Sequence, residues 1–213
     1  MDATYNTLAI YLAEKISNHP SHDRFLVAIA GIPGSGKSTL AKTLVDRVNE
    51  LVGKNVAIAV SMDGYHYPKK TLDTFPDPTE AYARRGAHWT FDAQGLLTLT
   101  EALRRPITDD QIITAPSYDH GKGDPVENDI KISSSHKLVI LEGLYLHLKE
   151  PPIWRSIASH MHELWGLHID PETEEQAIFR VENNDMVNAN YILENSLTPT
   201  RTVISVDEPA HTI

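Results

Sequence analysis

The sequence predicts an α/β fold in which a doubly wound, mostly parallel sheet of five strands is covered by helices on both faces. Short, continuous apolar runs separated by helix-like segments support this fold class, because the strands of a parallel sheet are buried on both faces. A glycine-rich loop between the first apolar run and the next helix-like segment also supports it, since such loops open phosphate-binding α/β units. The predicted strands are residues 25–30, 56–60, 138–141, 164–169 and 202–206.

Helix-like segments lie between these strands. Apolar residues at helical spacing predict an amphipathic helix over residues 3–17, which ends before His19-Pro20. A second helix is expected to begin at Ser38 and to end near Gly53, and a third covers about residues 93–104. Residues 116–129 are rich in Pro, Gly and Asp, so we expect a loop there.

Composition and charge exclude several classes of protein. A chain of 213 residues with 41% hydrophobic residues is long enough to bury the core of one globular domain. Its formal net charge of -10 leaves no general basic surface, so we expect no nucleic-acid partner. The absence of cysteine excludes disulfides, thiolate zinc sites and a cysteine nucleophile. Residues 1–20 carry neither a basic n-region nor a long apolar core, which predicts a cytoplasmic protein without a membrane segment.

Residues 31–38 spell G-x-x-x-x-G-K-S between a predicted strand and a predicted helix, which is the context that the phosphate-binding motif requires. Lys37 can reach the β- and γ-phosphates of ATP, and the Ser38 hydroxyl can bind Mg²⁺. The loop therefore predicts a P-loop NTPase, and a glycine-rich turn without a ligand is the alternative. The predicted nucleotide-binding residues of the loop are Gly31, Pro33, Gly34, Ser35, Gly36, Lys37, Ser38 and Thr39.

Two acidic residues are expected at the same edge of the sheet as this loop. Asp63 follows the predicted strand 56–60, and Glu142 ends the run 138–141. Ligands of doubly wound sheets bind beyond the carboxyl ends of the strands. At this place Asp63 is suited to act as a general base, and Glu142 is suited to help bind a metal ion. Ordinary strand-end carboxylates are the alternative. Lys37, Asp63 and Glu142 are thus the predicted catalytic residues, and Ser38, Asp63 and Glu142 the predicted metal-binding residues.

Further segments carry a more specific pattern than the phosphate loop alone. They are residues 27–40, 62–66, 84–87, 90–92, 116–120, 124–126 and 142–146. In this order they resemble the phosphoribulokinase/uridine kinase family of P-loop kinases, and they are closest to its nucleoside and sugar kinase-like branch. The resemblance covers residues 25–150 densely.

The resemblance implies roles for residues around an acceptor pocket. The aspartate at the position of Asp63 is taken in such kinases as the base that activates the acceptor hydroxyl. An arginine fork can hold a polar or phosphorylated acceptor at two points. The alternatives are a solvated arginine pair, a loop-capping histidine at position 66 and a turn stabilised by Tyr118 and His120. The predicted substrate-binding residues are His66, Arg84, Arg85, Tyr118, Asp119 and His120.

Relatives are expected to carry a lid helix with arginines after the fourth core strand, and here the pattern differs. Residues 164–170 run almost directly into the acidic segment 171–180, so a reduced lid and a following helix are expected over residues 171–195. Arg180 is the predicted substitute for a lid arginine at the nucleotide. The expected organisation is one P-loop kinase-like domain over 1–213, with an N-terminal helix in 1–20 and acceptor-pocket insertions and loops over 64–135.

These features favour an ATP- and Mg²⁺-dependent kinase that phosphorylates a hydroxyl of a small polar metabolite, a nucleoside or a sugar. A lid-deficient nucleotide-binding regulatory protein and an NTPase that transfers the phosphoryl group to water are the alternatives. The identity of the acceptor does not follow from the sequence. The oligomeric state does not follow either, and a homo-oligomer stays open.

Overall fold

The predicted parallel sheet of five strands is confirmed by the structure, a computed structural model that describes residues 2–53, 55–169 and 183–205. The strand order is β2-β5-β1-β6-β7, and every neighbouring pair is parallel. The sheet consists of β1 (Phe25–Ala30), β2 (Ala57–Ser61), β5 (Leu138–Gly143), β6 (Glu163–Ile169) and β7 (Arg201–Ser205).

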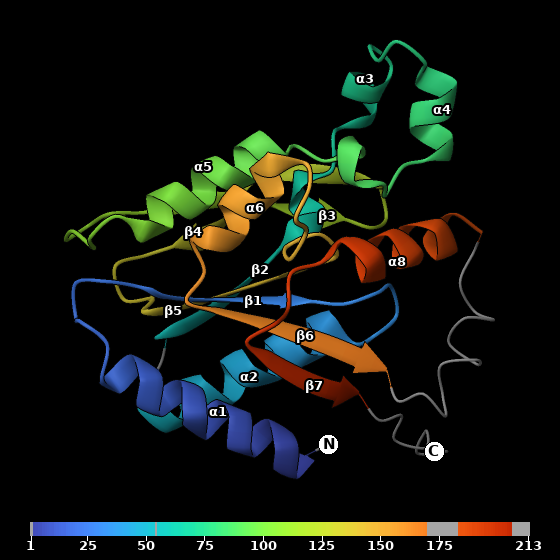
Figure 1. Ribbon diagram of the computed structural model, residues 1–213. Coiled ribbons are helices and arrows are strands. Elements are labelled where there is room, and N and C mark those ends of the chain that lie inside the picture. The colour runs from blue at the N-terminus through green and yellow to red at the C-terminus, as the bar shows by residue number, and fades with distance from the viewer. Residues whose placement is uncertain (1, 54, 170–182, 206–213) are drawn as a thin grey trace.

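Helices cover both faces of the sheet (Figure 1). Helices α1 (Asp2–Ser17) and α2 (Lys37–Val52) lie on one face, and α5 (Ala93–Arg104), α6 (Pro152–Ser159) and α8 (Asn183–Asn195) lie on the other. In the described ranges, none of the helices is long and apolar enough to cross a membrane.

Strand β1 shows why the central strands are apolar throughout. Leu26 and Ala28 pack into the core beneath α5 and α6, whereas Val27 and Ile29 pack into the core against α1 and α2. Because successive side chains of a strand point to opposite faces, both sets must be apolar when both faces are covered. The strand therefore carries the phosphate loop on a rigid base at its carboxyl end.

The prediction of a loop over residues 116–129 was wrong. Strands β3 (Ile113–Asp119) and β4 (Asp124–Ile132) form an antiparallel hairpin there. In its turn, the Asp119 carboxylate accepts hydrogen bonds from the N–H groups of Gly121 and Lys122, and Gly123 has a φ of 66°. The turn residues dominated the composition, and most residues of the two strands are half-buried or exposed, so the strands carry no clear alternation of apolar residues.

Short helical segments connect β2 to α5. They are η1 (Met62–Tyr65), α3 (Lys69–Leu72), α4 (Pro78–Ala83) and η2 (His88–Thr90). None of them is long enough to show a helical period in the sequence. The first segment, η1, follows directly on the carboxyl end of β2 and carries Asp63. These connections and the β3–β4 hairpin stand beside the sheet edge at which the phosphate loop begins.

Candidate active site

The register of the strands brings the two predicted acids to one edge of the sheet. Glu142 in β5 is the partner of Ile29 in β1 and of Ser61 in β2. Asp63 lies two residues beyond Ser61, and its N–H donates to the Ser61 hydroxyl oxygen at 3.2 Å. The Ser61 hydroxyl in turn hydrogen-bonds to the carboxylate of Glu142. A single serine therefore connects the backbone of Asp63 with the side chain of Glu142.

Lys37 lies at the start of α2 and is buried, with 8% of its surface exposed. Its Nζ donates to the carbonyl oxygen of Ile32 in the phosphate loop at 2.8 Å. Burial lowers the pKa of Lys37 to about 8, although the negative charges of Glu142 and Asp63 act in the opposite direction. The structure thus brings Lys37 into the electrostatic reach of both acids.

Glu142 is buried, and burial raises the pKa of its carboxyl group above the ordinary value. Hydrogen bonds from Ser61 and Ser38 and the charge of Lys37 oppose this shift, and the charge of Asp63 adds to it. The pairing of the Ser38 hydroxyl with the Glu142 carboxylate collects the hard oxygen atoms that Mg²⁺ prefers. The described residues contain no group of three His, Asp or Glu that could hold a metal ion.

The backbone of the phosphate loop depends on glycine at several positions. Gly34 and Gly36 have φ angles of 74° and 88°, a region that favours glycine. A Cβ at Gly31 would clash with the carbonyl oxygen of Leu167 in β6, so the loop can begin close against that strand. The hydroxyl of Ser35 is buried and has no hydrogen-bond partner among the described residues. Such an orphaned donor at the centre of the loop fits a bound anion.

The positions of the remaining predicted nucleotide-binding residues say little about their role. Pro33 is half-buried in the loop, and Thr39 is exposed in the first turn of α2. Arg180 and most of the predicted lid lie outside the described residues. Their proposed contacts with a nucleotide stay predictions.

Aromatic side chains gather near Asp63. His66 follows η1, and its Nδ1 donates to the carbonyl oxygen of Asp63 at 2.9 Å. The His66 ring lies 3.9 Å from the Phe91 ring and 4.9 Å from the Tyr118 ring, measured between centroids. The Tyr118 ring in turn lies 5.1 Å from the exposed His120. The structure brings these three predicted substrate-binding residues, His66, Tyr118 and His120, into one cluster.

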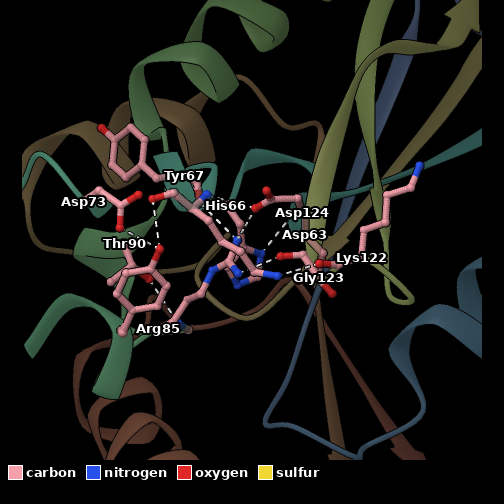
Figure 2. A network of polar contacts seen from close by, with 12 residues as sticks. Asp63, His66, Tyr67, Asp73, Arg85, Thr90, Lys122, Gly123 and Asp124 are labelled. Atoms are coloured by element: carbon pink, nitrogen blue, oxygen red, sulfur yellow. Dashed lines mark hydrogen bonds and ion pairs between the residues drawn. The ribbon is translucent and has the colours of Figure 1, made fainter. Parts of the chain in front are cut away.

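Arg85 is held by a network that sequence reasoning missed (Figure 2). Its Nη1 donates to the carbonyl oxygen of Gly123 at 2.6 Å, and its Nη2 donates to the carbonyl oxygen of Tyr67 at 3.1 Å. Nη2 also forms an ion pair with the carboxylate of Asp124 at 2.9 Å. Asp124 lies far from Arg85 along the sequence, and no spacing pattern signals the pairing. The predicted contact of Arg85 with an acceptor stays a prediction.

Asp119 and Arg84 lie at the edges of the same region. The carboxylate of Asp119 accepts the N–H groups in the hairpin turn and pairs with Lys122 at 3.3 Å. Arg84 is half-buried and ends α4, where its N–H donates to the carbonyl oxygen of Glu80. Both residues thus have structural contacts of their own.

Comparisons with known proteins agree with this arrangement. The sequence model of the Phosphoribulokinase / Uridine kinase family matches residues 26–184. A Schizosaccharomyces pombe protein named "Putative uridine kinase C227.14" is 39% identical over 195 residues, which cover 83% of this chain and 81% of the relative. The "ATP-dependent kinase-like protein notR'" of Aspergillus versicolor is 38% identical over 154 residues, 64% of this chain and 89% of the relative.

The fold is shared with solved structures. The crystal structure of YFH7 from Saccharomyces cerevisiae superposes with a TM-score of 0.77 and covers 96% of this chain and 99% of that chain. The two sequences are 20% identical, so this likeness shows the fold alone.

Proposed function

The chain belongs to the phosphoribulokinase/uridine kinase family, and we propose that this ATP-dependent P-loop kinase phosphorylates a hydroxyl group of a small polar metabolite, a nucleoside or a sugar. One observation carries the proposal. Lys37 lies within the electrostatic reach of both Asp63 and Glu142 at the carboxyl ends of β1, β2 and β5. A phosphate-binding cation, a general base and a metal-binding carboxylate are the groups that phosphoryl transfer to an alcohol requires.

The proposed roles follow from the position of each side chain. The loop amides and the Lys37 ammonium group bind the phosphates, and Lys37 exchanges its hydrogen bond to Ile32 for one to a phosphate oxygen. Asp63 accepts the proton of the acceptor hydroxyl, whose oxygen bonds to the γ-phosphorus while the bond to the β,γ-bridging oxygen breaks. The products are a phosphorylated acceptor and ADP.

The oxygen atoms around Ser38 fit Mg²⁺ as the accompanying cation. The Ser38 hydroxyl and the Glu142 carboxylate would hold the ion, with phosphate oxygens completing its shell. Asp63 is close enough for its charge to raise the pKa of Glu142, so the two carboxylates form one negatively charged region. When bound, Mg²⁺ offsets the negative charge of the phosphates and orients them for transfer.

The acceptor is proposed to lie against the aromatic cluster beside Asp63. His66 and Tyr118 would form a wall of this pocket, and His120 would close its exposed end. Asp119 would contact the acceptor from the hairpin turn, and Arg84 and Arg85 from the segment after α4. The resemblance of these residues to the acceptor segments of related kinases supports the assignment, as does the name of the uridine kinase relative.

Product analysis with γ-labelled ATP and a panel of nucleosides and sugars tests the proposal. The wild-type protein is expected to transfer the label to at least one acceptor. Asp63→Asn should reduce kcat by roughly 10²- to 10⁴-fold, the range of a lost general base, and should retain ATP binding. Asp109→Asn, at an exposed position between α5 and β3, is the control and should leave kcat unchanged. Release of phosphate to water alone would identify an NTPase, and ATP binding without any product would identify a regulatory protein.

A further inference from the structure

We propose that the cavity between helix α5 and the β3–β4 hairpin is a second ligand site, separate from the proposed catalytic site, and that its ligand is a small organic ammonium compound. The cavity has a volume of about 670 Å³, which lies in the usual range of small-molecule pockets. Helix α5 and strand β3 of the hairpin are neighbours in the fold (Figure 1). The inference does not depend on the proposed kinase function, because it concerns other side chains and is tested by binding.

The segment that follows Asp63 forms one wall of this cavity. Residues 64–68 line the cavity, whereas Asp63, Lys37 and Glu142 are not among the described residues of its walls. The other walls come from α3, α5 and both strands of the hairpin. The cavity and the aromatic cluster beside Asp63 share His66. Because no described residue of the phosphate loop lines the cavity, a ligand can occupy it while ATP is bound.

The side chain of Tyr65 brings an unpaired hydroxyl group to the cavity. Tyr65 lines the cavity, and 6% of its surface is exposed. Its hydroxyl group forms no hydrogen bond with any of residues 2–53, 55–169 and 183–205. Buried polar groups of native proteins are nearly always paired, and the hydroxyl group of a buried tyrosine usually finds a partner. The unpaired phenol therefore indicates a partner that enters the cavity from outside the chain.

The charges that act on this hydroxyl group are negative. Burial and the carboxylates of Asp92 and Glu127 raise the pKa of Tyr65. Burial and the carboxylate of Asp92 also raise the pKa of Tyr67, a second phenol of the cavity. Asp92 and Glu127 themselves line the cavity. Two carboxylates thus act on one point of its wall, and the resulting negative potential favours a cationic ligand.

Local structure holds both carboxylates at the cavity. Asp92 is the N-cap of α5, and its carboxylate accepts an N–H of the first helical turn at 2.8 Å. Glu127 lies at an irregularity of the hairpin, where residues 127–129 of β4 face Pro116 of β3 alone. Asn128 has a φ of 58° there. Bulges of this kind redirect side chains and are common beside binding sites, which fits the position of Glu127 at the cavity.

The other side chains of the walls fit an ammonium group that carries an apolar or aromatic body. Lys70 is the cation among the described lining residues, but it is exposed, so its charge is hydrated and screened by salt. Burial lowers the pKa of His66, so this imidazole is neutral at pH 7. Leu99 and Ile113 offer apolar contacts to the body of the ligand. The faces of the aromatic rings add attraction for a cation.

In the proposed complex, the ammonium group occupies the negative region beside the Tyr65 hydroxyl. Its N–H groups donate to the carboxylates of Asp92 and Glu127 and to the phenol oxygen, which has lone pairs available. The body of the ligand then lies against the apolar and aromatic side chains. This arrangement pairs the unpaired phenol and neutralises part of the negative charge in one step.

Calorimetry with three probes of similar shape and different charge tests the inference at pH 7 and low ionic strength. Tyramine carries an ammonium group, 4-ethylphenol carries no charge, and 4-hydroxyphenylacetate carries a carboxylate. Tyramine should bind about tenfold or more tightly than either of the others, because carboxylates and aromatic faces stabilise a cation. Its Kd should be unchanged by Mg²⁺ and a non-hydrolysable ATP analogue. No binding of tyramine, equal binding of the three probes, or competition with the ATP analogue would overturn the inference.

Two variants locate the bound tyramine. Glu127→Gln removes one negative charge at constant size, and Tyr65→Phe removes the hydroxyl group alone, so each should raise the Kd of tyramine by about threefold or more. Because the Tyr65 hydroxyl has no partner among the described residues, Tyr65→Phe should not lower the free energy of unfolding. Asp129→Asn is the matched control, since Asp129 lies on the same strand as Glu127 but bonds to Ser117, and it should bind tyramine like wild type. An unchanged Kd in either Glu127→Gln or Tyr65→Phe would place tyramine elsewhere and overturn the proposed site.

Discussion

The Ser61 hydroxyl hydrogen-bonds to the carboxylate of Glu142, its register partner across strands β2 and β5. The same hydroxyl oxygen accepts the N–H of Asp63. This relationship couples the proposed base to the proposed metal-binding carboxylate through one short side chain at the edge of the sheet. It follows from the parallel register alone, because that register places the carboxyl ends of β2 and β5 side by side.

Glu142→Gln should weaken the dependence of the reaction on the metal. The amide keeps the size of the side chain but removes the negative charge that faces Ser38. The Mg²⁺ concentration at half-maximal activity should rise by about tenfold or more, the usual effect of a lost residue near a metal. ATP binding in the presence of EDTA should change little, and its loss in Glu142→Gln would show that the carboxylate acts on the fold instead. Metal titrations of kcat and nucleotide binding by calorimetry measure the two effects.

Lys37→Met should make the ligand-free protein more stable while abolishing ATP binding. Burial lowers the pKa of Lys37 from 10.5 to about 8, so the folded state holds the proton less tightly than the unfolded state does. The penalty is fully present below pH 8 and is relieved as the pH rises from 8 to 10.5. Removal of the charge should raise the free energy of unfolding at pH 7 by about 1–3 kcal/mol, after loss of the hydrogen bond to Ile32.

Urea denaturation without nucleotide checks this expectation. Lys42→Met is the control, because Lys42 is exposed on α2 and pairs with Asp46. It should leave the unfolding free energy essentially unchanged. A lower free energy of unfolding for Lys37→Met than for wild type would contradict the view that the buried ammonium group destabilises the fold.

His147 should make the fold sensitive to acid. Its side chain is buried, its Nε2 donates to the carbonyl oxygen of Ala28 at 3.3 Å, and burial lowers its pKa from 6.5 to about 4. Between pH 6.5 and 4 the His147 imidazole therefore binds a proton in the unfolded state but not in the folded state. The free energy of unfolding consequently falls as the pH falls. At pH 5 the loss from this group is about 2 kcal/mol.

His147→Gln keeps a donor for Ala28 and cannot titrate, so its loss of stability between pH 7 and pH 5 should be smaller than that of wild type by about 2 kcal/mol. His22→Gln, at a side chain that is 66% exposed, is the control and should follow wild type. Denaturation midpoints at the two pH values give the comparison. Identical acid sensitivity in wild type and His147→Gln would assign the effect to other groups.

Gly64→Ala should damage both the fold and the site. A Cβ at this position would clash with the backbone carbonyl of Pro116, where η1 approaches β3 closely. We expect a loss of about 1–3 kcal/mol of stability, typical of overpacking, and a lower kcat because Asp63 is the preceding residue. Gly121→Ala is the control, since its Cβ would meet only the Asp119 carboxylate at the exposed turn. Thermal denaturation and kcat measure the two effects, and equal behaviour of both variants would contradict the close approach.

The sequence was most informative where burial imposes a pattern. The strands of the sheet and helices α1, α2 and α5 were predicted because their apolar residues must face a core. The convergence of Lys37, Asp63 and Glu142 was predictable because parallel strands present their carboxyl ends at one edge. Their convergence could be predicted from the positions of the strands, without the details of the loops.

The structure of the acceptor side could be predicted less well from the sequence. Most residues of the β3–β4 hairpin are half-buried or exposed, so its strands carry no clear apolar alternation, and its turn residues suggest a loop. The ion pair of Arg85 with Asp124 joins two distant segments, and either charge alone is compatible with a solvated surface position. Ser61 was missed because a serine at a strand end has many ordinary roles. These contacts depend on how loops pack, which local sequence patterns do not encode.

The central claim is that Lys37, Asp63 and Glu142 serve a single magnesium-nucleotide site. A crystal structure with Mg²⁺ and a non-hydrolysable ATP analogue tests it most directly. We expect the phosphates in the loop of residues 31–38, Lys37 Nζ on a β- or γ-phosphate oxygen, Mg²⁺ between Ser38 and the Glu142 carboxylate, and Asp63 facing the γ-phosphorus. A nucleotide bound away from this loop, or an Asp63 carboxylate turned away from the γ-phosphorus with no room for an acceptor between them, would contradict the account.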